Sequence, residues 1–275
     1  MVVFVVVATL LIGILGLLIG LFLGVASEKF KVVVDETEAR VREVLPGNNC
    51  GACGFPGCDG CAKAIAAKEA PVNQCPVGGA PVGAKVAEIL GVAAIETSED
   101  DKKVAFVRCQ GSCDKAKQTY SYTGIADCAD LAVVPNGSEK ECPYSCCGYG
   151  SCVKACAFDA IHVVNGVAVV DKEKCTSCGA CIKACPKNII TLVPYKKKHI
   201  VACMSHLKGK AVKDACSTGC IACTMCVKTC PFDAIHMADD LAVMDEKCRD
   251  CGLCAEKCPT GAITGKKTAA PAANA

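Results

Sequence analysis

Three runs of cysteines in the second half of the chain share one strict spacing, C-x2-C-x2-C-x3-C-P. Thiolates are the protein ligands of iron–sulfur clusters, and a tight loop of this spacing wraps three of them around one face of a cubane. The fourth cysteine binds the neighbouring cluster in two-cluster sites, and the proline ends the loop. The runs are Cys175, Cys178, Cys181 and Cys185; Cys220, Cys223, Cys226 and Cys230; and Cys248, Cys251, Cys254 and Cys258.

Disulfides and structural zinc are the ordinary alternatives for a chain with 27 cysteines among 275 residues. Disulfides within one run would close very small loops, which restrict the unfolded chain little, and an odd total leaves one thiol unpaired. Tetrahedral zinc sites use two separated cysteine pairs rather than four thiols in one run. The spacing therefore favours [4Fe-4S] clusters over both alternatives.

Exchange of the fourth cysteine assigns three clusters. The expected ligand sets are Cys220, Cys223, Cys226 and Cys258; Cys248, Cys251, Cys254 and Cys230; and Cys175, Cys178, Cys181 and Cys156. Cys185 is then left without a cluster unless another site lies beside residues 142–156.

The segment C-P-Y-S-C-C-G-Y-G-S-C-V-K-A-C at residues 142–156 has Tyr149 where the regular spacing would place a cysteine. Because the fourth ligand of the following run needs a partner cluster, we expect a functional site here. Three of its ligands are expected to be Cys146, Cys152 and Cys185. Cys142 lies one helical turn before Cys146 and Cys147 adjoins it, so either can supply the fourth thiolate, and we favour Cys142.

A different spacing, C-x2-C-x4-C-x16-C, occurs in N-N-C-G-A-C-G-F-P-G-C at residues 48–58 together with Cys75. Its glycines let the backbone approach sulfide closely and donate N–H bonds to it. The expected ligands are Cys50, Cys53, Cys58 and Cys75. Cys61 is expected to be a buried spare thiol.

V-R-C-Q-G-S-C has a ligand-like C-x3-C spacing, and Cys109, Cys113 and Cys128 are candidates for a further cluster. The alternative is a set of buried free thiols, which behave as small apolar residues. Cys203 and Cys216 have no assigned role. The chain thus has at least four clusters, five with the site at residues 142–156, and six if this last group binds one.

The elements that position these cysteines repeat. C-A-F-D-A-I-H at residues 156–162 returns as C-P-F-D-A-I-H at residues 230–236, and a short strand-like segment follows each copy. Such a repeat indicates a duplicated unit. We predict an α+β protein with one N-terminal transmembrane helix, a small α-rich 4Fe-4S domain and tandem ferredoxin-like modules. The expected divisions are 1–27, anchor; 28–98, N-terminal 4Fe-4S domain; 99–141, connecting segment; 142–200 and 201–265, ferredoxin-like modules; and 266–275, disordered tail.

Residues 2–26 have no charged side chain, and about 25 helical residues are long enough to span a bilayer. A cleaved signal peptide would need a basic segment before the apolar run, which is missing. Lys29 and Lys31 follow the run and place the rest of the chain on the cytoplasmic side. Gly16, Gly20 and Gly24 lie on one face of the helix, a pattern that favours close packing against a partner helix.

The sequence has no dinucleotide-binding fingerprint and no phosphate-binding G-x-x-x-x-G-K, so we expect no NAD or flavin site on this chain. A net charge of +2 does not indicate nucleic-acid binding. Several one-electron centres without a substrate pocket are typical of an electron relay between proteins. The basic run Lys196–Lys198 is either a solvated loop or a surface that steers an acidic electron carrier.

An N-terminal span, N-N-C-G-A-C-G-F-P-G-C with Cys75, and tandem ferredoxin runs together resemble the B subunit of the Rnf complexes. V-R-C-Q-G-S-C and the number of ferredoxin runs resemble the longer, clostridial-type form. Ala157 in place of proline after Cys156, and the extra Cys61, depart from the pattern.

The resemblance implies an electron-transfer component of a membrane ferredoxin:NAD+ oxidoreductase that moves Na+ or H+. It further implies reduced ferredoxin as electron donor, other complex subunits as partners, and a single-pass location in the bacterial cytoplasmic membrane. The alternative is a membrane-anchored polyferredoxin that serves a hydrogenase or dehydrogenase without ion pumping.

Overall fold

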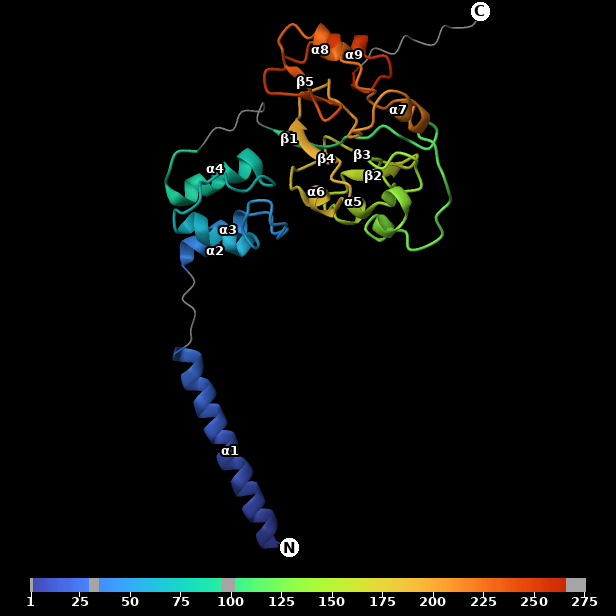
Figure 1. The fold of residues 1–275 in the computed structure, drawn as a ribbon. Coiled ribbons are helices and arrows are strands. Elements are labelled where there is room, and N and C mark those ends of the chain that lie inside the picture. The colour runs from blue at the N-terminus through green and yellow to red at the C-terminus, as the bar shows by residue number, and fades with distance from the viewer. Residues whose placement is uncertain (1, 30–34, 95–101, 266–275) are drawn as a thin grey trace, which may run out of the picture.

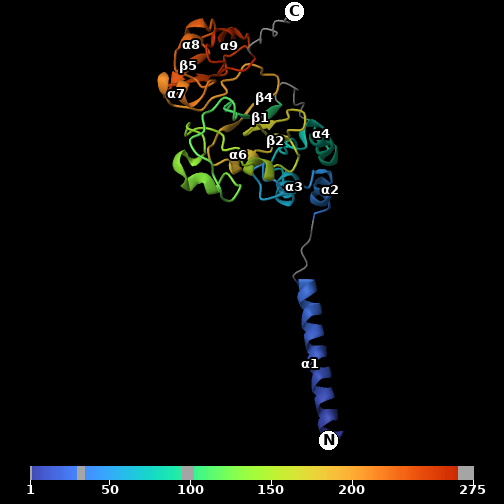
Figure 2. The same cartoon turned by 90° about the vertical axis from the view of Figure 1, so that its right-hand side faces the viewer.

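A computed structural model describes residues 2–29, 35–94 and 102–265; the tail expected at residues 266–275 lies outside them. The first element is helix α1, Val2–Lys29. Its segment Leu10–Ser27 has a mean hydropathy of 2.6, none of it is buried, and by length and composition it can cross a membrane. In two views at right angles α1 projects away from the rest of the chain (Figures 1 and 2).

Three helices form the small N-terminal domain: α2, Glu36–Val44; α3, Cys58–Ala66; and α4, Gly79–Leu90. The carboxylate of Asp35 accepts a bond from the N–H of Thr37 at 2.9 Å and so caps α2. Val41, Ile65 and Val86 come from the three helices and are almost completely buried together. The apolar face of α4 completes this core.

The first of the two modules expected from the sequence contains two antiparallel strand pairs. Strand β1, Lys103–Val107, pairs with β4, Ile190–Pro194, and β2, Ile161–Val164, forms a hairpin with β3, Val167–Val170. Two short helices, α5 (Ser151–Lys154) and α6 (Ala180–Ala184), and the 3-10 turns η2 (Asp130–Val133) and η3 (Pro135–Gly137) complete it. Strand β1 lies in the segment 99–141, which the sequence predicted as a connection. This segment therefore contributes one strand of the β1–β4 pair.

The second module repeats this arrangement with less regular structure at its edge. Strand β5, Ile235–Ala238, pairs with β6, Leu241–Met244, and the helices of this module are α7 (Lys210–Ala215), α8 (Met225–Thr229) and α9 (Leu253–Lys257). A single antiparallel bridge between Val201 and Ile263 stands where the first module has β1 and β4. The second module lies above the first in Figure 1.

The duplication extends to single hydrogen bonds. The N–H of Asp171 donates to the carbonyl of Ala160 at 2.8 Å, and Asp245 donates to Ala234 at 3.0 Å. Each module has its own apolar core, the first including Ile161 and Ile189 and the second including Ile235 and Leu241. Cysteines are members of both cores, so the same side chains that bury apolar area also face the candidate sites.

Candidate metal centres

None of the 27 cysteines forms a disulfide. Among the described residues, no three His, Cys, Asp or Glu side chains converge as the ligands of a single ion would. A mononuclear zinc site requires such convergence, whereas each thiolate of a cubane binds a different iron at a separate corner. Thiols spread around a cavity therefore fit a cluster better than an ion.

Two cavities in the second module are lined by four cysteines each. One is lined by Cys220, Cys223, Cys226 and Cys258. The other is lined by Cys230, Cys248, Cys251 and Cys254. In both, the fourth cysteine of one run joins the first three of the other, as the spacing predicts.

The third regular set lies in the first module. Burial and the nearby thiols of Cys178, Cys175 and Cys156 raise the pKa of Cys181 to about 11. Backbone N–H groups point at two of the sulfurs: Ala105 donates to Cys175 at 3.3 Å and Ala160 to Cys156 at 3.4 Å. Bonds of this kind stabilise a thiolate once a metal replaces its proton.

The N-terminal set surrounds the start of α3. Burial raises the pKa of Cys75, whose sulfur accepts the N–H of Gly78 at 3.4 Å and lies near Cys53 and Cys58. Cys50 lies in the same loop, half-buried. The predicted spare thiol, Cys61, is 1% exposed. Burial first, and then Cys53, raises the pKa of Cys61 to about 12, so it remains a protonated neighbour of this set.

The loop at residues 146–152 has the backbone shape of the regular loops although Tyr149 replaces a cysteine. In each of the four loops, the residue two positions before the third cysteine has a positive φ. These residues are Gly150 (76°), Gly179 (74°), Thr224 (60°) and Gly252 (84°). Gly148 (83°) likewise matches Ser177, Ala222 and Asp250, which precede the second cysteine with φ between 55° and 61°. The backbone therefore has the same loop shape here as in the three regular runs.

The cavity beside this loop is lined by five cysteines: Cys128, Cys146, Cys147, Cys152 and Cys185. Cys142, which the sequence interpretation favoured as the fourth ligand, instead lines a different cavity. The reason is that residues 142–145 form a tight turn, with Ser145 N–H donating to the Cys142 carbonyl at 3.1 Å. The turn directs Cys142 and Cys146 to different cavities, where a helix would have placed them on one face.

Cys128 reaches this cavity from a segment that precedes the loop. Its sulfur accepts bonds from the Cys147 thiol and from the N–H groups of Ser151 and Tyr149, and these lower the pKa of Cys128 to about 5. The Cys147 sulfur also lies 3.2 Å from the carbonyl oxygen of Gly137, a second acceptor for its single thiol hydrogen, and its bond to Cys128 raises the pKa of Cys147 strongly. Around the buried Cys152 lie the thiols of Cys146, Cys128 and Cys185. Spacing gave no signal for Cys128, because only the tertiary fold brings it to the loop.

The cysteines suggested for a further cluster lie apart. Cys109 lines the cavity that also contains Cys142, whereas Cys128 lines the other cavity. Cys113 is exposed, and its sulfur accepts a long bond of 3.7 Å from Gln118. Cys203 and Cys216, which had no assigned role, line the cavity of Cys109 and Cys142.

A buried cation lies between these sites. Lys140 is 3% exposed, and its Nζ donates to the carbonyls of Gly111 (2.7 Å), Cys146 (3.0 Å) and Gly166 (2.7 Å). The lysine therefore joins the loop after Cys109, the loop of Cys146 and the β2–β3 turn. Its charge also opposes the negative charge of nearby thiolates.

Three family models match parts of the chain. "Putative Fe-S cluster" covers residues 45–77, "4Fe-4S binding domain" residues 168–191, and "4Fe-4S dicluster domain" residues 219–262. The matches contain the N-terminal set and the regular runs.

Several curated proteins are similar over nearly the whole chain. The B subunit of the Na+-translocating ferredoxin:NAD+ oxidoreductase complex of Acetobacterium woodii is 46% identical over 93% of this chain and 76% of its own length. The B subunit of an ion-translocating oxidoreductase complex of Methanosarcina acetivorans is 45% identical over 90% and 94%. The B subunit of the proton-translocating ferredoxin:NAD+ oxidoreductase complex of Clostridium ljungdahlii is 46% identical over 91% and 88%.

Proposed function

Because this chain belongs to the family of B subunits of ion-translocating ferredoxin:NAD+ oxidoreductase complexes, we propose that it carries electrons from reduced ferredoxin to the other subunits of such a complex. Electron flow to NAD+ there drives Na+ or H+ across the membrane. The observation that carries the proposal is the series of thiol-lined cavities in and between two duplicated modules. A polyferredoxin without ion pumping is not favoured, since these relatives are named for ion translocation.

We infer five ligand sets, and bound clusters there would supply one-electron carriers. They are Cys50, Cys53, Cys58 and Cys75; Cys128, Cys146, Cys152 and Cys185; Cys156, Cys175, Cys178 and Cys181; Cys220, Cys223, Cys226 and Cys258; and Cys230, Cys248, Cys251 and Cys254. Backbone N–H groups directed at the sulfurs tune such sites, and the apolar cores exclude water from them.

The chain's own residues suggest where ferredoxin docks. A groove runs beside β4 and β6, and Cys248 is among its lining residues. Its basic residues are Lys103, Arg108, Lys196, Lys197 and Arg249, and its acidic residues are Asp245, Glu246 and Asp250. The excess of positive charge beside a cluster ligand suits an acidic electron carrier.

The anchor fits the same assignment. Helix α1 would hold the chain in the cytoplasmic membrane, with Lys29 at its cytoplasmic end. The iron–sulfur modules then face the reducing compartment that contains ferredoxin.

The test uses the full-length chain within its complex, in sealed anaerobic membrane vesicles. Reduced ferredoxin should bleach the visible absorption of the clusters, and NAD+ addition should reoxidise them while Na+ or H+ crosses the membrane. NAD+ reduction without any cation movement would overturn the coupling. Clusters that ferredoxin does not reduce would overturn the role as electron acceptor.

A further inference from the structure

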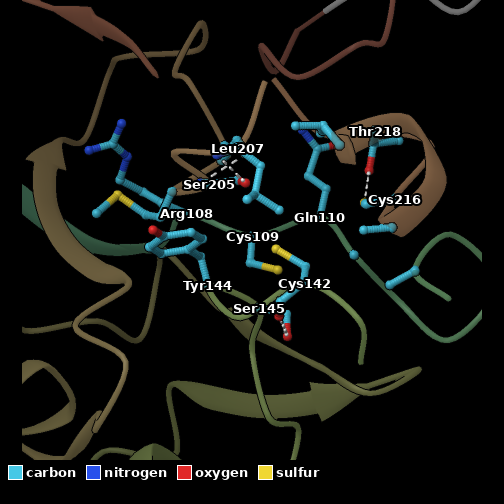
Figure 3. Close-up of a pocket in the computed structure, with 18 residues that line it drawn as sticks. Arg108, Cys109, Gln110, Cys142, Tyr144, Ser145, Ser205, Leu207, Cys216 and Thr218 are labelled. Atoms are coloured by element: carbon cyan, nitrogen blue, oxygen red, sulfur yellow. Dashed lines mark hydrogen bonds between the residues drawn. The ribbon is translucent and has the colours of Figure 1, made fainter. Parts of the chain in front are cut away.

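One cavity lined by four cysteines is made by both modules together. Its cysteines are Cys109, Cys142, Cys203 and Cys216. Two come from the first half of the duplicated region and two from the second. Figure 3 shows Cys109 and Cys142 side by side in the cavity, with Cys216 from the opposite module beyond Gln110.

The four sulfurs surround a common space. A methyl group added at Gly111 would lie 3.5 Å from the Cys216 sulfur and 3.6 Å from that of Cys109. In addition to burial, the thiols of Cys109 and Cys216 are close enough to raise the pKa of Cys142, and Cys142 in turn raises the pKa of Cys203. The cavity is slightly larger than the three other cavities lined by four or five cysteines. It is therefore as roomy as the spaces beside the regular runs.

The sulfurs have the hydrogen bonds of metal-bound thiolates. The N–H of Cys146 donates to the Cys109 sulfur at 3.5 Å, and the N–H of Cys220 donates to the Cys203 sulfur at 3.3 Å. Cys203 accepts a second bond from Ser205 N–H at 3.4 Å. The Thr218 hydroxyl lies 3.5 Å from the Cys216 sulfur. N–H groups aimed at sulfur favour the anionic form that iron requires.

These four positions are related by the duplication. Cys109 follows the strand residue Val107 by two positions, and Cys203 follows the bridge residue Val201 by two positions. Cys142 precedes the first cysteine of its loop, Cys146, by four positions. Cys216 precedes Cys220 by the same number. The N–H of Cys146 donates to Cys109, and the N–H of Cys220, the equivalent residue of the second module, donates to Cys203. The cavity therefore has pseudo-twofold symmetry.

The surroundings suit a buried anionic group. Apolar side chains of Met204, Leu207 and Val212 line the cavity. Arg108 also lines it, and its Nε donates to the Val201 carbonyl at 3.1 Å. A guanidinium stays charged even where burial lowers its pKa, so it offsets part of the negative charge. If these cysteines were only small apolar core residues, there would be no reason for four of them to meet beside N–H donors and a buried cation.

We propose that Cys109, Cys142, Cys203 and Cys216 bind a sixth [4Fe-4S] cluster at the seam between the two ferredoxin-like modules. Its ligand Cys109 touches the backbone of Cys146, a ligand of one cluster, and Cys203 touches that of Cys220, a ligand of another. The seam cluster thus stands between the two modules as an intermediate electron carrier. That relay role rests on the proposed function, whereas iron binding does not.

The experiment measures iron, acid-labile sulfide and zinc per full-length chain, prepared and analysed anaerobically. Six clusters correspond to about 24 irons and five to about 20. About 24 irons in the unaltered chain supports the proposal, and about 20 or fewer overturns it. This count does not depend on whether any variant folds. One zinc per chain in place of four irons would also overturn it.

Variants then place the additional cluster. Cys109→Ser, Cys203→Ser and the double variant should each lose the same amount, about four irons and four sulfides, because all three remove one cluster. Cys113→Ser is the matched control, since its thiol is exposed and outside the cavity, and it should lose none. Unchanged iron in Cys109→Ser or Cys203→Ser would overturn the assignment. Because the readout is metal content, it stands even if ferredoxin proves not to be the electron donor.

Discussion

Tyr149 occupies the loop position where the regular spacing has a cysteine, and a cysteine from a distant segment, Cys128, lies beside the loop instead. The tyrosine ring leaves the cluster loop and packs edge-on against Tyr122, with ring centroids 5.8 Å apart. The sulfur of Cys128 occupies the space beside the loop and accepts the N–H groups of Tyr149 and Ser151. The loop thus keeps its shape while the thiolate comes from another segment.

Cys128→Ser should remove about four irons from the chain, because it removes the proposed fourth ligand of this site. Cys147→Ser should leave the iron count unchanged, since Cys147 acts as a hydrogen-bond donor. Tyr149→Cys added to Cys128→Ser should restore the lost irons by recreating the regular spacing. If Cys147→Ser loses the iron and Cys128→Ser does not, the two roles are reversed.

Lys140→Met should weaken the fold by at least about 2 kcal/mol, because it leaves buried carbonyl groups without a donor. It should also lower the reduction potential of the nearest cluster, since a positive charge stabilises the more negative reduced form. The control is Lys117→Met, whose exposed pair with Glu141 should contribute less than about 1 kcal/mol. Anaerobic denaturant titration and a redox titration measure the two effects, and equal stability of the variants would contradict the role of Lys140.

At the scale of elements, spacing predicts that the first three cysteines of each regular run lie around one space, because a short loop determines where its own thiols lie. The strand at Val104–Val107 could also be predicted, because four consecutive apolar residues lie there between basic ones. Its pairing with β4 could not, since a local pattern does not identify a partner more than 80 residues away. The same limit explains why the sequence favoured Cys142 over Cys128 as the fourth thiol beside the loop at residues 146–152. A turn and a long-range contact decide their positions, and neither leaves a local pattern.

The β1–β4 pair should be important for stability of the first module. Val104 is completely buried in β1. Val104→Ala should cost about 2 kcal/mol, from the lost transfer free energy and the small cavity left behind. Val169→Ala in β3 is the matched control, because its side chain is 49% exposed and should change stability by less than about 0.5 kcal/mol. The measurement is the midpoint of anaerobic denaturation, and equal shifts would show that β1 contributes little.

At the scale of the whole molecule, the basic groove and the anchor determine which partners reach the clusters. Lys196→Glu with Lys197→Glu should slow reduction by ferredoxin roughly tenfold at low salt and flatten its salt dependence. The control Lys210→Glu with Lys213→Glu changes charge equally on α7, outside the groove. Stopped-flow absorption measures the rates. Equal slowing by both pairs would indicate a general charge effect instead of docking in the groove.

The exposed glycine face of α1 should matter only when the complex is assembled. In the isolated chain, a Cβ at Gly16, Gly20 or Gly24 meets nothing within 4 Å. Gly20→Leu should nevertheless reduce co-purification of the other membrane subunits, because a bulky side chain prevents close helix packing. Leu18→Ile, on the opposite face, is the control. Undiminished recovery of partners with Gly20→Leu would show that this face does not contact them.

The seam between the modules also has a consequence for biosynthesis. Cys109 and Cys216 are separated by about a hundred residues, which a ribosome takes roughly 5 to 20 s to add. The sites within one module can receive iron while the chain is still growing. The shared site becomes complete only when the second module has emerged and folded against the first. Its maturation is therefore the last step, and until then the chain presents two half-sites of open thiols that must be kept from oxygen.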